Sequence, residues 1–438
     1  MLQLVNVGRK SLADYGSIAP RGLMDEIRQL AEPLQGTRVV HLSATAFGGG
    51  VAEINYTLVP LMADAGLDVE WRIIAGENEF FDVTKTIHNA LQGNPQGLTP
   101  EQQEIFTRYN AQNAANFADD YDVVVVHDPQ PVAMIDHFPD TAARWVWRGH
   151  IDFSTPNESV MQFLLPSIRR YDAAIFHLRE YVPREPGLPE CFIWPPAIDP
   201  LAPKNMALSP EDARYIVNQF GIDVDRPLLT QVSRFDPWKD PLGVIDCYRL
   251  VKHEVPDVQL ALVGSMAHDD PEGWDFYNQT VTYAADDPDI HILSNLNNVG
   301  SVEVNAFQVH SEAVIQKSIK EGFGLTVSEA LWKGCPTVAA TWAGSAPRSW
   351  TARRDGWSTP PRPAPTPASR SCTTPPRASG ARSPARSTSA ATSSRPGSCA
   401  TGSCCSTGCS ATTSASTSSS PSGPPRPRPS RPSRLRRA

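Results

Sequence analysis

Two carboxylates stand eight positions apart in the segment that says most about chemistry, Glu321-Gly-Phe-Gly-Leu-Thr-Val-Ser-Glu329. The glycines between them let the backbone bend tightly and bring its N–H groups towards a ligand. A helix beginning near Leu325 would add free N–H donors and a positive dipole end, both of which favour an anion. The two glutamates are then placed to contact different parts of one elongated ligand. A glycine-rich turn with two solvated glutamates is the alternative, and the spacing alone does not decide between them.

Two basic side chains form a second candidate, in the segment Ser233-Arg-Phe-Asp-Pro-Trp-Lys239-Asp-Pro. The segment follows an apolar run typical of a strand and precedes a stretch typical of a helix. Arg234 and Lys239 could close on a diphosphate, because a guanidinium supplies bidentate geometry and an ammonium supplies a point charge. Basic residues after a strand are also common on protein surfaces, where Asp236 and Asp240 would simply neutralise them.

Three consecutive glycines, Gly48, Gly49 and Gly50, separate another strand-like run from a helical stretch. Such a loop admits a ligand close to the backbone at the start of the helix. The pattern is not the Gly-x-Gly-x-x-Gly of dinucleotide-binding proteins, so it disfavours NAD. A plain turn is the alternative, although one glycine would suffice for that.

Two histidines follow strand-like runs that would end at the same edge of a sheet. His150 could donate to a sugar hydroxyl, and Asp152, two positions on, could orient it or accept from the sugar. His127 holds the equivalent place after its own run. For both histidines the alternative is a purely structural hydrogen-bonding role. Residues 1–340 contain no Gly-x-Ser-x-Gly, His-Glu-x-x-His, P-loop or Cys-x-x-Cys motif.

Short apolar runs alternate with longer amphipathic stretches between residues 37 and 340. Residues 123–126, all valine, are the kind of strand that a sheet covered on both faces requires. Repeated strand–helix units predict parallel sheets, and this many residues exceed one such sheet. We therefore expect an α/β fold with two doubly wound parallel-sheet domains, residues 1–200 and 201–342, facing a cleft. The expected strands are 37–43, 68–74, 122–127, 144–148, 173–177, 228–233, 259–264, 291–293, 313–316 and 336–340, and the expected helices include 51–64, 101–117, 159–171, 242–254 and 325–333.

The chain changes character after about residue 341. Residues 351–438 contain 21 Ser, 15 Pro and 14 Arg but no Ile, Val, Phe or Tyr, so they cannot bury enough apolar surface to offset the entropy of ordering. We expect a disordered, low-complexity tail over residues 343–438. Its cysteines match no standard four-ligand zinc spacing, and we expect no metal site. These cysteines are Cys372, Cys399, Cys404, Cys405 and Cys409.

Charge and cysteine usage narrow the class of partner. The 351–438 segment carries +13, so residues 1–350 carry −21 of the total of −8. An acidic body argues against nucleic acid or an anionic membrane as a partner. Cys191, Cys247 and Cys335 fit a reduced, cytoplasmic compartment, and neither an apolar run of membrane-spanning length nor a signal-peptide pattern is present. Small molecules are the expected partners, and a homodimer is left open.

Taken together, the motifs resemble those of retaining glycosyltransferases with the two-domain GT-B fold. The Glu-x7-Glu element and the Arg/Lys pair are marks of that superfamily. The similarity is closer to one subgroup, the trehalose glycosyltransferring synthases with the related trehalose phosphorylases, and it covers nearly all of residues 10–340. It rests above all on His41-Leu-Ser-Ala-Thr-Ala-Phe-Gly-Gly-Gly-Val-Ala-Glu53, Trp147-Arg-Gly-His-Ile-Asp152 and Gln316-Lys-Ser-Ile-Lys-Glu-Gly-Phe-Gly-Leu-Thr-Val-Ser-Glu-Ala-Leu-Trp-Lys-Gly334.

The resemblance implies transfer of glucose from a nucleoside-diphosphate glucose to glucose, forming trehalose with retention and without a further cofactor. A trehalose phosphorylase, or a non-catalytic remnant that only binds sugar, is the alternative. No protein nucleophile is evident, which suits same-face attack with the departing phosphate taking the acceptor's proton, whereas glycoside hydrolases pair two carboxylates across the bond. The implied catalytic residues are Glu321 (donor hexose), Arg234 and Lys239 (diphosphate) and His150 (near the reacting carbon), and the implied binding residues are Gly48, Gly49, Gly50, Asp152, Gly322, Phe323, Gly324, Leu325 and Glu329 (ribose).

The chain departs from that family after Ala340. The family continues with a Val-Gly-Gly-Ile-type loop, whereas this chain has Thr341-Trp-Ala-Gly-Ser345. Codons for these residues, shifted by two bases, permit Val-Gly-Gly-Ile, and the same shift through Asp355-Gly-Trp-Ser-Thr-Pro360 permits Trp-Leu-Val-Asp-Thr. Ser, Pro, Arg, Ala and Gly are also what GC-rich DNA yields in a wrong frame. We interpret the tail as a frameshift product that impairs catalysis.

Overall fold

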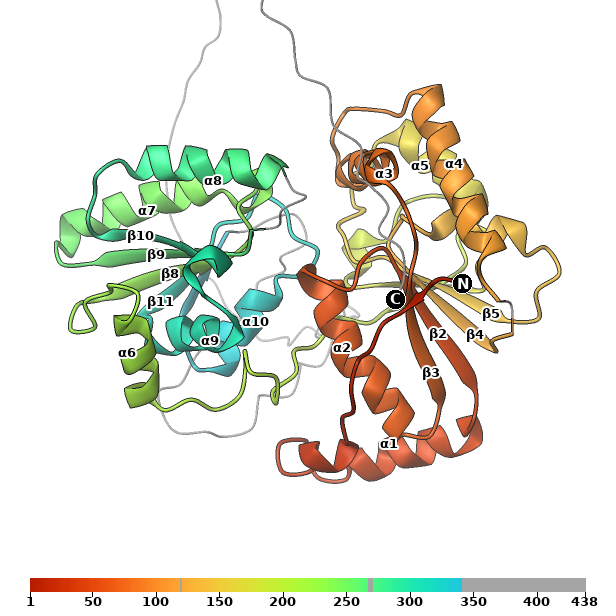
Figure 1. The fold of residues 1–438 in the computed structure, drawn as a ribbon, viewed down its shortest axis with the longest axis horizontal. Helices are drawn as coiled ribbons and strands as arrows, with labels where there is room; N and C mark the ends of the chain where they lie inside the picture. Colours follow the sequence, from red (N-terminus) through yellow and green to blue (C-terminus); the bar gives the residue numbers. More distant parts are fainter. Residues whose placement is uncertain (119, 267–270, 341–438) are drawn as a thin grey trace, which may run out of the picture. The chain divides into compact units, whose positions relative to one another are not determined.

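The computed structural model describes residues 1–340 except residue 119 and residues 267–270. Two β-sheets organise these residues (Figure 1). The strands of the first sheet follow the order β1-β3-β2-β4-β5-β6-β7, and all neighbours are parallel except β1 and β3. The strands are β1 (Gln3–Leu4), β2 (Arg38–Ser43), β3 (Asp68–Ile73), β4 (Val123–His127), β5 (Arg144–Arg148), β6 (Ala173–Phe176) and β7 (Glu190–Ile193).

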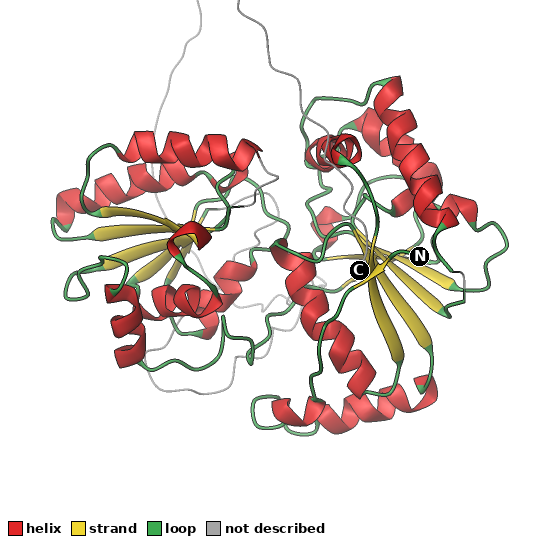
Figure 2. Cartoon of the chain, viewed as in Figure 1, coloured by secondary structure: helices red, strands yellow, loops and turns green. Residues whose placement is uncertain are grey.

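Helices cover both faces of the first sheet (Figure 2). One face packs its larger core against α3, α4 and α5, with Val40, Val124 and Trp147 among the fully buried strand residues. The other face packs a smaller core against α2, in which Trp71 of β3 is fully buried. Alternate strand residues point to opposite faces, so both faces need apolar side chains. The helices are α1 (Leu23–Ala31), α2 (Gly49–Asp64), α3 (Asn78–Leu91), α4 (Pro100–Ala115) and α5 (Glu158–Ile168).

The second sheet is parallel throughout, in the order β10-β9-β8-β11-β12. Helices α6 and α9 cover one face and helices α7 and α8 cover the other, each over its own apolar core. The strands are β8 (Leu228–Val232), β9 (Gln259–Gly264), β10 (Ile290–Ser294), β11 (Ala313–Gln316) and β12 (Thr337–Ala339), and the helices are α6 (Pro210–Asn218), α7 (Pro241–Glu254), α8 (Pro271–Ala284), α9 (Ser301–His310) and α10 (Leu325–Trp332).

The expected α/β fold with two parallel-sheet domains is confirmed, with β1 as an antiparallel addition at one edge. Strands β5, β9 and β11 begin and end where the sequence predicted them. The first sheet ends at Ile193 and α6 begins at Pro210, while the domain limits at residues 200 and 342 stay predictions. The proposed tail at 343–438 lies outside the described residues.

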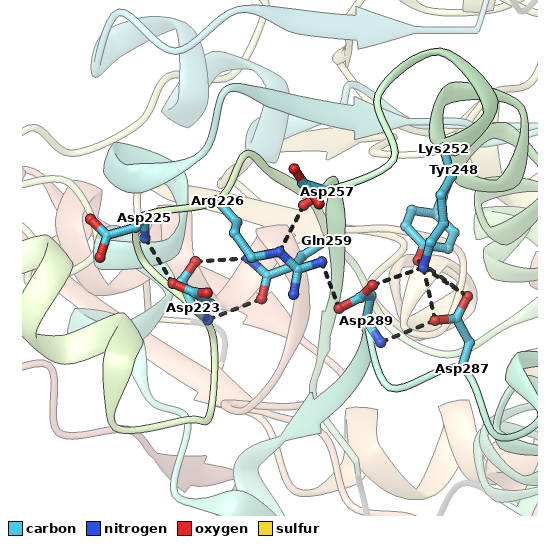
Figure 3. A network of polar contacts seen from close by, with 9 residues as sticks. All are labelled: Asp223, Asp225, Arg226, Tyr248, Lys252, Asp257, Gln259, Asp287 and Asp289. Atoms are coloured by element: carbon cyan, nitrogen blue, oxygen red, sulfur yellow. Dashed lines mark hydrogen bonds and ion pairs between the residues drawn. The ribbon is translucent and has the colours of Figure 1, made fainter.

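A network of charged side chains joins the amino ends of the second sheet's strands (Figure 3). Lys252 of α7 lies 3.1 Å from an oxygen of Asp287 and 2.9 Å from one of Asp289, just before β10. Arg226, before β8, reaches the other oxygen of Asp289 at 2.7 Å. The network therefore holds one helix and two strands together at the edge opposite the carboxyl ends, where ligands of such sheets bind.

Strand β12 is the edge of the second sheet, and it has little cover. The side chain of Val338, at its centre, is 63% exposed. Within residues 1–340, as far as they are described, β11, α10 and the turn before β12 share one small apolar cluster, made of Val314, Ala330 and Cys335. Apolar residues of parallel strands are ordinarily covered on both faces, so this corner of the sheet is incompletely packed among the described residues.

Candidate active site

The predicted site residues lie just beyond the carboxyl ends of four parallel strands. Gly48, Gly49 and Gly50 follow β2, and His150 and Asp152 follow β5 of the first sheet. In the second sheet the Arg234–Lys239 segment follows β8 and the Glu321 loop follows β11. The carboxyl ends of parallel strands are where open α/β sheets bind ligands.

Three donors converge on one oxygen of Glu321, which is 9% exposed. Lys239 Nζ lies 2.5 Å from its Oε1, while Gln316 Nε2 at 2.8 Å and Ser318 Oγ at 2.9 Å donate to the same atom. The carboxylate is therefore held in one orientation by a charge-assisted bond and two neutral ones. Among the described residues no bond to Oε2 is recorded, which leaves that oxygen as an acceptor for a ligand hydroxyl.

The two basic residues that the sequence paired have different protein partners. Two hydrogen bonds fix the backbone of Lys239: its N–H donates to Asp236 Oδ1 at 3.1 Å, and its carbonyl accepts from Gln231 Nε2 at 2.8 Å. Arg234 is more open, with 57% of its side chain exposed, and its Nη2 forms an ion pair with Asp236 Oδ2 at 3.0 Å. Asp240, which we considered as a neutralising partner, instead pairs with Lys317.

Both cations act on one half-buried histidine of α3. Desolvation and the charges of Arg234 and Lys239 together lower the pKa of His88 to about 4. The effect places the two cations within electrostatic reach of the same point, as a shared diphosphate would require. His88 stays neutral there, so it does not add to the positive charge.

The glycines fall where backbone segments approach each other closely. A Cβ on Gly322 would lie 2.1 Å from the carbonyl oxygen of His150, and a Cβ on Gly50 would lie 3.0 Å from Leu325 Cδ1. Gly48, Gly49 and Gly324 instead have positive φ, at 69°, 76° and 76°. Gly322 is thus required by a contact between the two sheets' loops, whereas the sequence analysis predicted that it lets the backbone bend and bring its N–H groups towards a ligand.

The second glutamate of the motif is fully inside the protein. Glu329 of α10 is 1% exposed, and its Oε1 lies 3.1 Å from Lys204 Nζ. The same ammonium reaches Glu53 of α2 at 3.0 Å. Glu329 Oε2 is buried, and no residue in the described part of the chain bonds to it. An unsatisfied buried carboxylate oxygen is costly, so it marks the place where a ligand hydroxyl could donate.

His150 is buried with both ring nitrogens bonded to other histidines. Its Nε2 lies 2.8 Å from His127 Nδ1, and its Nδ1 lies 3.2 Å from His177 Nε2. A hydrogen bond from His150 to the donor sugar would therefore have to replace one of these two bonds. The predicted contact of His150 with the donor sugar stays a prediction. Asp152 is buried as well, and its Oδ1 accepts from the Ser154 N–H at 2.8 Å.

Sequence reasoning missed the groups that hold the Glu321 loop against the first sheet. Tyr181 OH donates to the Glu321 carbonyl at 2.7 Å, and His177 Nδ1 lies 3.2 Å from the Gly322 carbonyl. The Phe323 ring meets the His177 ring edge-on, with centroids 5.9 Å apart. His177 follows a strand-like run and could have been singled out like His150, whereas Tyr181 stands in no recognisable motif.

Lys204 was missed for a similar reason, because it lies between β7 and α6 in a segment read only as a domain boundary. Over residues 1–340, apart from 119 and 267–270, no group of three or more His, Cys, Asp or Glu residues could hold a metal ion. The helices of these residues also include none that is long and apolar enough to cross a membrane.

Two family models match the chain in succession. "Trehalose synthase, N-terminal domain" covers residues 41–183, and "Glycosyl transferases group 1" covers residues 212–370. A trehalose synthase of Rubrobacter xylanophilus is 60% identical over 346 residues, which are 78% of this chain and 83% of the relative. A trehalose phosphorylase of Pleurotus pulmonarius is 28% identical over 76% of this chain and 52% of its own length.

A solved trehalose-6-phosphate synthase has the same fold, with a TM-score of 0.56 at 15% identity over 69% of this chain and 84% of its own. Identity this low bears on the fold alone. The 60% match spans more than two thirds of its relative. The two family models contain the Gly48–Gly50 loop, the histidine segments and the Glu321 loop, whose geometry is given above. The chain belongs to the trehalose synthase family of group 1 glycosyltransferases.

Proposed function

We propose that this protein transfers glucose from a nucleoside-diphosphate glucose to glucose, forming trehalose with retention of configuration. The observation that carries the proposal is the Glu321 carboxylate, which three donors hold by Oε1 while Oε2 takes no bond from the described residues. That arrangement can accept hydroxyls of a donor hexose in one fixed orientation. The 60% identical relative named a trehalose synthase supports the same product.

The diphosphate would lie against Arg234 and Lys239. The exposed guanidinium of Arg234 can exchange its ion pair with Asp236 for a bidentate contact with phosphate oxygens. Lys239, already 2.5 Å from Glu321, places its ammonium between the sugar-binding carboxylate and that charge. Positive charge fixed where the leaving diphosphate gains negative charge lowers the barrier to its departure. The unpartnered Oε2 of Glu329 is available to a ribose hydroxyl.

A synthase is favoured over a phosphorylase because the phosphorylase relatives match at 28% identity and only about half their length. The two activities differ in donor. Purified protein is to be incubated with glucose and either ADP-glucose or UDP-glucose, or with glucose and glucose 1-phosphate. Trehalose from a nucleotide sugar supports the proposal, and trehalose from glucose 1-phosphate alone would replace it with the phosphorylase.

We also propose that the altered sequence after Ala340 lowers this activity. The match to the Rubrobacter relative leaves about a sixth of that protein without a counterpart here. The same assay is to be run on this chain and on a version whose reading frame is restored after codon 340. The three cysteines of the described residues, Cys191, Cys247 and Cys335, are free, which supports a reduced, cytoplasmic location. We expect no cofactor besides the donor nucleotide sugar, and a homodimer is left open.

A further inference from the structure

Four histidines form a continuous row across the carboxyl edge of the first sheet. They stand in or directly after strands β2, β4, β5 and β6, which are neighbours in that order. Each ring nitrogen pair is within hydrogen-bonding distance: His41 Nδ1 to His127 Nε2 at 2.9 Å, His127 Nδ1 to His150 Nε2 at 2.8 Å, and His150 Nδ1 to His177 Nε2 at 3.2 Å. The row ends outside the sheet, where His177 Nδ1 faces the Gly322 carbonyl.

All four rings are buried, with exposures between 1% and 8%. Burial is the main cause that lowers the pKa of each, and the buried guanidinium of Arg148 lowers all four further. Asp128, a buried carboxyl beside the row, accepts the backbone N–H of His150 at 2.7 Å and has a pKa raised by burial. The four imidazoles are therefore neutral near pH 7.

Neutrality fixes the direction of every bond in the row. A neutral imidazole has one N–H donor and one bare nitrogen, and a carbonyl oxygen can only accept. His177 must then donate from Nδ1 to Gly322, which leaves its Nε2 to accept from His150 Nδ1. By the same reasoning, His150 Nε2 accepts from His127 Nδ1, and His127 Nε2 accepts from His41 Nδ1. All four rings are therefore assigned the Nδ1–H form, and the bare nitrogen left over is His41 Nε2.

The structure agrees with this assignment at the far end. His41 Nε2 is buried and has no hydrogen-bond partner among the described residues. Had the row run in the other direction, His41 would present an unpaired N–H there and His177 a bare nitrogen against the Gly322 oxygen. Two lone pairs facing each other at 3.2 Å are repulsive, so the reverse direction is excluded.

We propose that this histidine row is a positioning device for the donor-sugar loop, with His41, His127 and His177 as its positioning residues. The row presents one N–H to the Gly322 carbonyl in a fixed orientation. With the Tyr181 bond to the Glu321 carbonyl, it holds both ends of the Glu321–Gly322 peptide step against the first sheet. The predicted effect of the row on donor binding rests on the proposed role of Glu321. The direction of the hydrogen bonds along the row does not.

The direction is tested by nitrogen chemical shifts of the imidazoles in the full chain labelled with ¹⁵N-histidine. We expect the Nδ1–H form at all four positions, assigned by comparison with single variants. His177→Phe removes the carbonyl anchor and should leave a mixture of tautomers at the remaining three. His41→Leu removes only the free end and should leave the other three in the Nδ1–H form. An Nε2–H form at any of the four wild-type positions would overturn the proposal.

The positioning role is tested by the dissociation constants of ADP-glucose and UDP-glucose, measured separately by calorimetry. Loss of one buried hydrogen bond predicts about five- to tenfold weaker binding in His177→Phe. His177→Asn keeps an amide N–H near the place of Nδ1, so its affinity should return towards the wild-type value. Equal affinity in His177→Phe and wild type, with both melting normally, would refute the role. If neither nucleotide sugar binds the frame-restored protein, the proposed donor is wrong while the tautomer result stands.

Discussion

Replacing Gly322 by alanine tests whether close contact between the two sheets' loops sets the geometry of the site. The added Cβ would lie 2.1 Å from His150 O, 3.2 Å from His150 C and 3.5 Å from Ile151 Cα. All three atoms are backbone, so no side-chain rotation can make room. Carbon contacts are favourable only beyond about 3.5 Å, so the two segments must separate by about 1 Å or more.

That separation acts directly on the two bonds across this contact. Tyr181 OH to Glu321 O, at 2.7 Å, and His177 Nδ1 to Gly322 O, at 3.2 Å, would both be lengthened or lost. Two such bonds are worth about 2 kcal/mol, and forced overpacking typically costs about 1–3 kcal/mol more. A displacement of about 1 Å at groups that orient a substrate lowers kcat by about 100-fold.

The assay is trehalose formation by the frame-restored protein, with thermal melting of the same variant. Gly334→Ala is the matched control, because its φ of +76° strains an alanine while no atom lies within 4 Å of the new Cβ. The control should lose about 1 kcal/mol of stability and keep its kcat. A Gly322→Ala protein with kcat within about twofold of wild type would refute the reasoning, since the contact would then be dispensable.

Three further predictions concern charge, pH and the chain's end. Glu321→Ala and Arg234→Ala should each lower the turnover of the frame-restored protein by about 100-fold with unchanged circular dichroism, and near-normal turnover in either removes that residue from the mechanism. The folded state holds the pKa of His41 at about 3 and that of His177 at about 4, below their unfolded values, so stability should fall as the pH falls from 6.5 towards 4, by up to about 1.4 kcal/mol per pH unit for each fully titrating histidine. Asp128, whose pKa is raised to about 7, has the opposite effect, because its folded form binds the proton more tightly than its unfolded form. A melting temperature that stays constant from pH 7 to pH 5 would contradict the predicted loss of stability. Restoring the frame after codon 340 should raise both melting temperature and activity, and equal values in the two proteins would refute the frameshift.

The sequence predicts the interior strands well because their apolar runs are continuous. Strand β4 consists of four valines and a histidine, and β9 is buried along nearly its whole length. Strand β7 (Glu190–Ile193) escaped prediction because its apolar run, 191–194, is short, and because the strand pairs on one side only and is half-buried. Two-residue β1 leaves even less of a pattern.

For the site, residue types and strand ends predict which side chains gather but not what each one contacts. The Glu321 loop and Lys239 follow neighbouring strands, so their proximity was predictable, whereas the 2.5 Å contact between them was not. The histidine row requires the strand order β2-β4-β5-β6, which the sequence does not state. Tyr181 and Lys204 act only through the tertiary fold, and nothing local distinguishes them.

The incomplete packing at β12 connects the end of the described chain to the chemistry. The three-residue strand pairs only with β11, and β11 leads directly into the Ser318 and Glu321 loop. Val338 at its centre is 63% exposed, so the described residues do not supply the apolar surface that ordinarily covers such a strand. Burying a valine side chain contributes about 1.5–3 kcal/mol, a large share of a domain's net stability of about 5–15 kcal/mol. A strand that opens readily loosens β11, and with it the carboxylate that three donors hold in place.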